Sequence, residues 1–344
     1  MSMQAVVYRA ARRVEVEDRT AAEPGPGEVR IAVAFTGICG TDLHIFHGDM
    51  DARVGAGAVL GHEMSGRIDA IGPGVTGWSI GQPVTVMPTL SCGHCPACRR
   101  GNAHICHNLK FLGIDSPGAM QSLWNVPADL VLALPDQLPL DHAALVEPVS
   151  VAVHDVRRAG VSPGDHVVVV GGGPIGTLIA IVAQRERARV VLVEPDPFRR
   201  SVAAELGIEA LDPAAVDVVA TTDEHTAGAG ADIAFEVSGS SGGVETAVQV
   251  LATRGRLVMV AIHPQPRAVS LHRVFWRELE LFGARLYERP DVIAAIELVA
   301  SGAVPADRLI SLIEPVAAVD AAFAALESGG RVMKVLIDWR ELGR

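Results

Sequence analysis

Four of the five cysteines lie within the segment CGHCPACRRGNAHIC. Two, two and seven residues separate them, so a single loop can wrap four thiolates around a tetrahedral ion. Four sulfur ligands leave no open position, which is typical of a structural zinc site. Inside a cell, such clustering favours a metal over disulfides. We therefore predict a structural zinc ion held by Cys92, Cys95, Cys98 and Cys106.

The fifth cysteine, Cys39, lies in GICGTDLH, and the segment GHEMSG supplies His62 and Glu63. A thiolate, an imidazole and one or two carboxylates can bind zinc and leave a position for water or substrate. Glu147 lies in the otherwise apolar segment LVEPVSVAV, where a carboxylate without a nearby cation would be costly. These residues predict a second, catalytic zinc site. A core cysteine and a helix-capping Glu147 are the alternative explanations.

A third group of residues has the pattern of a dinucleotide site. The segment VVVVGGGPIGTLIA fits G-x-G-x-x-G through Gly171, Gly173 and Gly176, directly after a predicted strand. Glycines at these positions permit a tight turn, close approach of the backbone to a pyrophosphate and close packing of helix on strand. Pro174 and Ile175 begin the following helix, whose amino terminus favours phosphate. An ordinary glycine-rich turn is the alternative.

The residues that follow predict which dinucleotide binds. The next predicted strand ends at Glu194, about 20 residues further on, where a carboxylate can accept hydrogen bonds from the ribose 2′-hydroxyl of NAD. Arg199 and Arg200 come shortly afterwards, and arginine at that place can bind the 2′-phosphate of NADP. Ser238, at the end of a later predicted strand, is assigned to the same site. We predict NAD, with NADP as the alternative.

The elements that must position these residues follow two patterns. Up to about residue 138, short runs of branched residues punctuated by Gly and Pro predict strands. Helical spacing begins in residues 138–160, after which strands and helices alternate. The predicted strands are 166–171, 188–195, 231–239 and 255–262, and the predicted helices are 174–186, 199–207 and 243–255. The alternation predicts an α/β fold with a doubly wound parallel sheet.

After this region the chain has one more helical pattern and ends in a strand-like segment, GRVMKVLIDW. We therefore predict two domains. A β-rich catalytic domain spans residues 1–148 and is completed by 288–344, and an NAD-binding domain spans 149–287.

Composition excludes several classes of protein. The chain has 344 residues, of which 49% are hydrophobic and 20% charged, as in globular proteins. A net charge of -11 argues against a nucleic-acid-binding face, which needs clustered Lys and Arg. No apolar segment is long enough for a membrane span, and the charged amino terminus does not resemble a secretory signal. We expect a cytoplasmic protein with no nucleic-acid or membrane partner.

Several motifs in this order resemble the zinc-dependent medium-chain dehydrogenase/reductase family. They are PGPGEV, GICGTDLH, GHEMSG, the four-cysteine segment, EPVSVAVH and GGGPIG, and together they cover nearly the whole chain. The resemblance implies a GroES-like catalytic domain joined to a Rossmann domain. Because Glu147 stands where ethanol-type members carry a cysteine, EPVSVAVH is most similar to the sorbitol and butanediol dehydrogenase branch.

The resemblance also implies roles for individual residues. Cys39, His62 and Glu63 would bind the catalytic zinc, with Glu147 either ligating zinc or holding its water. Asp42 would accept the other ring N–H of His62. Thr41 and His44 would pass the substrate proton outward. Lys334 would lie near the cofactor phosphate.

The expected activity is oxidation of a secondary alcohol, polyol or vicinal diol to a ketone, with two zinc ions per chain and hydride transfer to NAD. L-Threonine 3-dehydrogenase is the alternative enzyme, and a catalytically silent cofactor-binding protein is the alternative outside enzymes. We expect a small-molecule alcohol or ketone as the partner and a homo-oligomer, dimer or tetramer.

Overall fold

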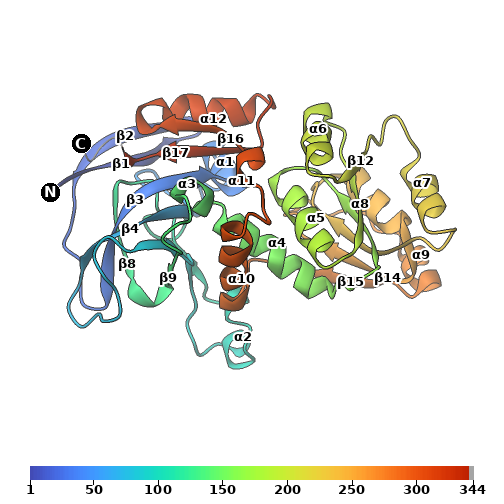
Figure 1. Cartoon of the computed structure of the whole chain (residues 1–344), viewed down its shortest axis with the longest axis horizontal. Coiled ribbons are helices and arrows are strands. Elements are labelled where there is room, and N and C mark those ends of the chain that lie inside the picture. The colour runs from blue at the N-terminus through green and yellow to red at the C-terminus, as the bar shows by residue number, and fades with distance from the viewer. Residues whose placement is uncertain (341–344) are drawn as a thin grey trace. The chain divides into compact units, whose positions relative to one another are not determined.

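The computed structural model describes residues 1–340, which form two compact units (Figure 1). The first unit comprises residues 1–147 together with the chain from residue 288 onward, and the second comprises residues 148–287. Helix α4 (Val146–Ala159) carries the chain from the first unit into the second.

The first unit is built on a seven-stranded sheet in the order β16-β17-β3-β4-β5-β9, with β8 also paired to β3. Strand β17 pairs antiparallel with β3, so a strand near the end of the chain joins one near its beginning. The strands of this unit are β1 (Ser2–Ala10), β2 (Arg13–Thr20), β3 (Glu28–Ile38), β4 (Glu63–Ile71), β5 (Pro83–Val86), β6 (Thr89–Leu90), β7 (Lys110–Phe111), β8 (Leu123–Pro127), β9 (Val131–Ala133), β16 (Ile310–Pro315) and β17 (Lys334–Asp338).

The helices of the first unit are short apart from two near the end of the chain. They are α1 (Gly40–Phe46), α2 (Pro96–Arg99), α3 (Leu140–Ala143), α10 (Arg289–Ala300), α11 (Ala306–Leu309) and α12 (Val319–Glu327). Apolar side chains from β3 and β4, such as Ile31 and Ile68, pack in one core with Phe323 of α12 and Trp339 beyond β17. This shared core explains why the last segment belongs to the first unit.

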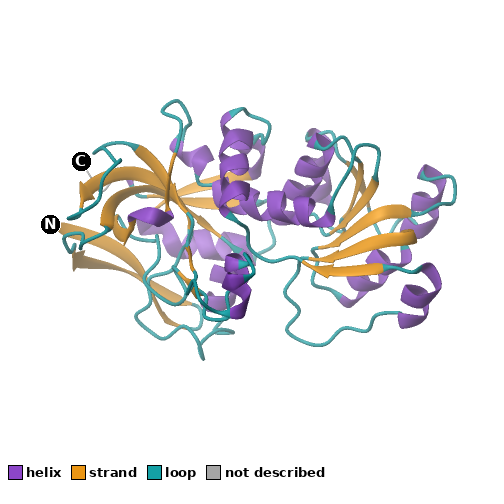
Figure 2. Cartoon of the chain, turned by 90° about the horizontal axis from the view of Figure 1, so that it is seen from below, coloured by secondary structure: helices purple, strands orange, loops and turns teal. Residues whose placement is uncertain are grey.

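The second unit is a parallel sheet of six strands in the order β12-β11-β10-β13-β14-β15, with helices on both faces (Figure 2). Its strands are β10 (His166–Val170), β11 (Arg189–Val193), β12 (Glu209–Leu211), β13 (Ala231–Glu236), β14 (Leu251–Met259) and β15 (Glu280–Gly283). Its helices, besides the end of α4, are α5 (Pro174–Arg185), α6 (Pro197–Glu205), α7 (Val218–His225), α8 (Ser241–Gln249) and α9 (Leu271–Arg277).

The order of the strands reverses between β10 and β13, which lie side by side although two strands separate them in the chain. Ligands of doubly wound sheets bind outside the carboxyl ends of the strands at such a point. The valines of β10 are buried, as expected for a strand covered on both faces. The expected α/β fold, with a β-rich unit and a doubly wound parallel sheet, is confirmed.

The largest difference in extent lies at the boundary between one predicted helix and the next strand. The helix predicted over residues 243–255 ends at Gln249 as α8, and β14 begins at Leu251. The pairing of Leu251 with Ala231 of β13 draws the end of this apolar run into the sheet, where Leu251 is fully buried. Tertiary pairing thus overrides the helical pattern.

Within residues 1–340 no helix combines the length and apolar character that a membrane crossing requires.

Candidate zinc and dinucleotide sites

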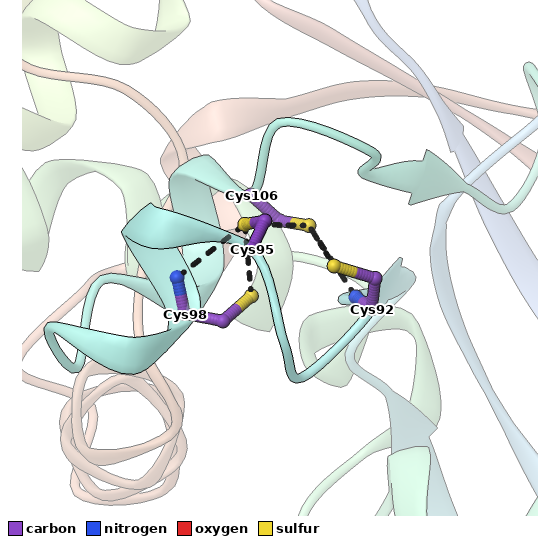
Figure 3. Close-up of side chains that lie close together, drawn as sticks. All are labelled: Cys92, Cys95, Cys98 and Cys106. Carbon is purple, nitrogen blue, oxygen red and sulfur yellow. Dashed lines mark hydrogen bonds between the residues drawn. The ribbon is translucent and has the colours of Figure 1, made fainter.

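The four clustered cysteines point their sulfurs toward one another (Figure 3). The Sγ atom of Cys95 lies 3.5 Å from that of Cys98 and 3.7 Å from that of Cys106, which lies 3.5 Å from that of Cys92. Four sulfurs bound tetrahedrally to zinc at about 2.3 Å would be about 3.8 Å apart. The arrangement therefore fits the closed shell of a structural zinc.

The electrostatics of this group also favour a cation. A hydrogen bond from the backbone of His94 is the main cause that lowers the pKa of Cys92 to about 5. Burial and the neighbouring sulfurs raise the pKa of Cys98 to about 11. Without a cation the four thiols cannot all ionise, because neighbouring thiolates repel one another. A zinc ion removes that repulsion.

A second group of metal-type donors forms where β3 ends and β4 begins. Gly37 pairs with Glu63 across the two strands. This pairing brings Cys39, two residues after Gly37, close to His62, the residue before Glu63, and the Cys39 sulfur lies 3.2 Å from Nε2 of His62. Asp42 completes a cluster whose ligand atoms lie within 4.8 Å of one another. Cys39 also precedes α1, and the Asp42 carboxylate accepts its N–H at 2.9 Å.

The predicted bond between Asp42 and the other ring nitrogen of His62 is absent from the hydrogen bonds of residues 1–340. Oδ1 of Asp42 and Nδ1 of His62 are both buried and have no partner there. The carboxylate instead holds the backbone of Cys39, because the capping geometry of α1 places Asp42 three residues after it. The ring of His62 makes a T-shaped contact with that of Phe111, with centroids 4.9 Å apart.

Glu63 is engaged by a residue from the far end of the chain. The Lys334 ammonium donates to Oε1 and Oε2 of Glu63 at 2.8 and 2.7 Å, and lies 3.3 Å from the carbonyl oxygen of Ile38. Both side chains are buried, and the pairing of Val335 with Ile38 places Lys334 there. These three contacts match the three N–H groups of an ammonium. In this geometry Lys334 has no donor left for a cofactor phosphate.

Negative charge surrounds this lysine. Burial by itself would lower the pKa of Lys334, but Glu63, Cys39 and, more weakly, Glu147 hold it above its usual value. Burial is also the main cause that raises the pKa of the Cys39 thiol, with Asp42 and Glu63 adding to the effect. Glu147 is 7% exposed and lies in the first turn of α4. A thiol, an imidazole and several buried carboxylates fit a zinc ion that retains an open position.

Thr41 and His44 lie on α1, three residues apart and so on one face of the helix. Thr41 is half-buried, whereas the His44 side chain is exposed and its Nδ1 lies 3.1 Å from Oδ2 of Asp49. The two side chains therefore lead along α1 from the residues next to Cys39 toward solvent.

The glycine-rich turn follows β10, and α5 begins at Pro174. A Cβ atom at Gly176 would lie 1.8 Å from the carbonyl oxygen of Gly171, so only glycine fits. Gly171 has a φ of 108°, and a Cβ there would lie 2.8 Å from the backbone nitrogen of Ser238. Gly173 caps α5, and Ile175 lies in its first turn. The turn therefore presents backbone and a helix amino terminus, as phosphate binding requires.

Glu194 directly follows β11 and is buried, and its carboxylate accepts the N–H of Gly172 at 2.6 Å and that of Asp196 at 2.8 Å. Nη1 of Arg199 lies 3.9 Å from this carboxylate, and the arginine side chain is 39% exposed. Arg200 is held by the backbone carbonyl of Glu194 and by Asp212. Of the two arginines, Arg199 is therefore the one able to meet a ligand.

Sequence reasoning missed Glu236, which closes β13. Its fully buried carboxylate accepts hydrogen bonds from Ser238, from Gly239 and from His263. The available signal was an acidic residue toward the end of a predicted strand that follows the glycine-rich turn, as Glu194 also is.

A doubly wound sheet with a glycine-rich turn, together with a β-rich unit holding two groups of zinc-type donors, defines a zinc-dependent nicotinamide-nucleotide dehydrogenase. Two family descriptions match the chain. The alcohol dehydrogenase GroES-like domain matches residues 25–136, and the zinc-binding dehydrogenase domain matches residues 174–301.

Two relatives agree with this class. A 2-dehydro-3-deoxy-L-galactonate 5-dehydrogenase of Pseudoalteromonas atlantica is 46% identical over 336 residues, which cover 98% of each chain. An L-threonine 3-dehydrogenase of Pyrococcus horikoshii is 36% identical over 266 residues, which cover 76% of each.

Three solved structures are also similar, each aligned over 98% of this chain and 99% of its own. A Sinorhizobium meliloti protein bound to NADP has a TM-score of 0.92 at 29% identity. An Escherichia coli protein in complex with NADH has a TM-score of 0.91 at 26% identity. The 2R,3R-butanediol dehydrogenase of Bacillus subtilis has a TM-score of 0.91 at 30% identity.

The chain belongs to the zinc-dependent medium-chain dehydrogenase family. It is an oxidoreductase that acts on the CH–OH group of an alcohol or polyol, with zinc and a nicotinamide dinucleotide as cofactors.

Proposed function

We propose that the substrate is a secondary alcohol with a neighbouring hydroxyl or carbonyl oxygen, within a sugar acid or polyol, and that the product is the ketone. The observation that carries the proposal is the donor set around Cys39, where His62 and the carboxylates of Glu63 and Glu147 stand in place of further thiolates. Oxygen donors make a bound ion harder and better suited to a second substrate oxygen. The relative from Pseudoalteromonas atlantica, named for a sugar-acid substrate, supports this class.

Within the first unit, we assign Cys39 and His62 to holding the catalytic zinc, with Glu63 or Glu147 as the carboxylate ligand. Zinc, when bound, would polarise the alcohol oxygen and lower its pKa. The Thr41 hydroxyl then accepts the substrate proton as it passes its own proton toward His44, which releases a proton to solvent, since the two residues share one face of α1. We assign Lys334 to holding Glu63, because its three contacts are within this unit.

Within the second unit, we assign the pyrophosphate to the glycine-rich turn of Gly171, Gly173 and Gly176 at the amino end of α5. Glu194 would accept hydrogen bonds from the adenosine ribose, which favours NAD, because a 2′-phosphate beside this carboxylate meets like-charge repulsion. Arg199 offsets part of that repulsion, being the exposed arginine beside Glu194. We propose that residues 1–148 with 288–344 form the catalytic domain and that 149–287 bind NAD.

The test is a comparison of catalytic efficiency under one set of conditions, with NAD and with NADP. The substrates are a 2-dehydro-3-deoxy sugar acid, sorbitol, 2,3-butanediol, L-threonine, cyclohexanol and ethanol. We expect an oxygen-rich secondary alcohol to be best, because a polar partner left unpaired by a simple alcohol costs affinity. Ethanol as the best substrate would contradict the proposal, and L-threonine would select the activity named for the Pyrococcus relative.

The cofactor assignment is read from the same assay. The wild-type chain should have a higher catalytic efficiency with NAD than with NADP. Glu194→Ala should reduce the ratio of the two efficiencies. NADP used as well as or better than NAD by the wild-type chain would overturn the assignment of Glu194.

We also propose a cytoplasmic homo-oligomer. Four thiols clustered as metal ligands suit a reducing compartment. Strand β15 ends the sheet of the second unit, and large apolar side chains are exposed on it and on the helix α9 before it: Leu271, Phe275, Trp276 and Leu281. An unpaired edge strand flanked by exposed aromatic residues suits association with a second copy of the chain.

A further inference from the structure

One carboxylate organises the end of β13. Oε1 of Glu236 accepts hydrogen bonds from the backbone N–H groups of Ser238 and Gly239, each at 3.0 Å, and from the Ser238 hydroxyl at 2.6 Å. Oε2 faces Nε2 of His263 at 3.0 Å. Glu236 is fully buried, so these contacts replace the water that the charge would otherwise require.

His263 is in turn held by an arginine. Nε of Arg267 donates to Nδ1 of His263 at 3.4 Å. Because a guanidinium can only donate, this contact makes Nδ1 the acceptor and leaves the proton on Nε2, which donates to Glu236. Arg267 also donates to the carbonyl of Gly239 at 3.1 Å and to the hydroxyl of Ser241 at 3.2 Å.

These contacts join two segments that are far apart in the chain. Residues 260–270 connect β14 to α9 without regular structure, and His263 and Arg267 both lie in this connection. Through Glu236 and Gly239 they fix it to the turn of residues 237–240.

That turn lies directly against the glycine-rich loop. The N–H of Val237 donates to the carbonyl of Val170 at 2.9 Å, and Gly171 approaches Ser238 so closely that a Cβ atom would clash. Both segments leave the carboxyl ends of β10 and β13, where the strand order reverses and where a dinucleotide binds in this type of sheet.

We propose that His263 and Arg267 are positioning residues for dinucleotide binding, acting through Glu236 on the turn of residues 237–240. Neither residue need contact the cofactor. His263 supplies the hydrogen-bond donor that the buried Glu236 carboxylate needs. Arg267 keeps the His263 ring in the tautomer that carries this donor. The proposal rests on the assignment of the dinucleotide to the glycine-rich loop.

Removing the imidazole would leave Oε2 of Glu236 buried without a donor. An unsatisfied buried carboxylate draws in water or shifts the groups around it, and here those groups are the backbone N–H of Ser238 and Gly239. The loss therefore disturbs the turn of residues 237–240, beside the glycine-rich loop, rather than the hydrophobic core.

The experiment is a fluorescence titration of the zinc-loaded full-length chain with NADH, together with the thermal midpoint of unfolding without NADH. Four variants are compared with wild type: His263→Ala, His263→Gln, Arg267→Ala and, as a control, His225→Ala. His225 is a partly exposed histidine of the same unit, 3.6 Å from Glu209. Glutamine retains an N–H donor for Glu236, so it tests the donor rather than the ring.

We expect His263→Ala to raise the dissociation constant of NADH about tenfold, as for loss of one donor to a buried charge. Arg267→Ala should have a smaller effect in the same direction, and His263→Gln should recover most of the affinity. His225→Ala should bind NADH as wild type does. In the His263 and Arg267 variants, turnover at saturating cofactor should change less than the Michaelis constant for NAD.

Two different failures are distinguishable. If the wild-type chain binds NADH but His263→Ala binds it within twofold of wild type, the positioning role is wrong, whatever happens to the unfolding midpoint. If wild type binds neither NADH nor NADPH, the assignment of the dinucleotide to the glycine-rich loop is wrong and the inference falls with it. Should His263→Ala fail to fold, an affinity of Arg267→Ala for NADH equal to that of wild type would overturn the proposal.

Discussion

At the scale of single residues, the two groups of zinc donors should behave differently when a sulfur is removed. The four-cysteine group is closed, whereas Cys39 shares its site with an imidazole and carboxylates. We expect two zinc ions in the wild-type chain and one in either Cys39→Ala or Cys92→Ala. Cys39→Ala should abolish turnover with a small change in stability, and Cys92→Ala should mainly destabilise the fold, because structural zinc contributes folding energy.

Metal analysis of purified protein, paired with thermal unfolding, checks this prediction. One zinc in fully active wild-type protein would refute the second site. Equal loss of stability in the two variants would refute the division into a structural and a catalytic ion.

The buried pair of Lys334 and Glu63 is a second feature at this scale. Both side chains are at most 5% exposed, so removing one partner leaves the other charge buried without compensation. Lys334→Met should therefore lower the free energy of unfolding by about 3–5 kcal/mol. Adding Glu63→Gln should recover part of the loss, because the uncompensated charge is then gone.

Denaturant unfolding of the metal-free single and double variants measures this coupling. Lys110→Met is the matched control, since Lys110 is the other lysine of the chain and is exposed. Additive effects of the two substitutions would show that the pair does not stabilise the unit.

His44 provides the test of the proton path. Its exposed ring and its place on the same face of α1 as Thr41 suit transfer to solvent. We expect His44→Ala to slow alcohol oxidation by about a hundredfold, and added imidazole to restore part of the rate. An unchanged rate and pH profile would mean that His44 is an ordinary surface residue.

At the scale of elements, the segment after the four-cysteine loop supports the ring of His62. Arg53 donates two hydrogen bonds to Asp115, at 2.8 and 2.7 Å, and Asp115 accepts the N–H of Phe111, whose ring contacts His62. The hydrogen bond from Arg53 is the main cause that lowers the pKa of Asp115. The fold of this loop therefore depends on an ionised carboxylate.

The lowered pKa of Asp115 fixes how its contribution to stability changes with pH. A carboxyl group whose pKa is lower in the folded state stabilises the protein above its unfolded pKa, about 3.9, and that contribution is lost as the pH falls through the folded value. Asp115→Asn should thus cost stability at pH 7 and cost progressively less below about pH 4. Because Arg53 is 46% exposed, solvent screening limits the loss to about 1 kcal/mol or less.

Urea unfolding of Asp115→Asn and wild type between pH 3 and pH 8 gives the measurement. A stability difference that stays constant down to pH 3 would mean that the charge of Asp115 does not contribute.

At the scale of the whole molecule, the exposed apolar edge of the second unit predicts association. Trp276 and Leu281 are 72% and 44% exposed, and β15 ends the sheet. A charge placed at either position should weaken contact with a second copy, because burying an unpaired charge at an interface is costly. We expect the wild-type chain to sediment as a dimer or tetramer and Trp276→Glu or Leu281→Glu to shift it toward the monomer.

Analytical ultracentrifugation over a range of concentrations checks this expectation. Ile80→Glu serves as the control, because Ile80 is also an exposed apolar side chain but belongs to the first unit. A monomeric wild-type chain would contradict the prediction, as would an equal effect of the control.

The sequence alone determined the features that depend on neighbours in the chain. The four cysteines, the glycine-rich turn and the strand that ends at Glu194 each lie within about two dozen residues, so spacing and residue type define their chemistry. The alternation of strands and helices likewise predicts the parallel sheet, because each element has its own hydrophobic period. The end of α8 could not be predicted in this way, since pairing with β13 decides where that helix stops.

Only the tertiary structure decided which partners the buried charges have. Lys334 meets Glu63 across 271 residues of sequence, and His263 meets Glu236 across 27, with a helix and a strand between them. No local period encodes such a contact, because it arises when strand order and register bring two distant segments to one place. The need to compensate a charge that folding removes from water then makes each contact specific.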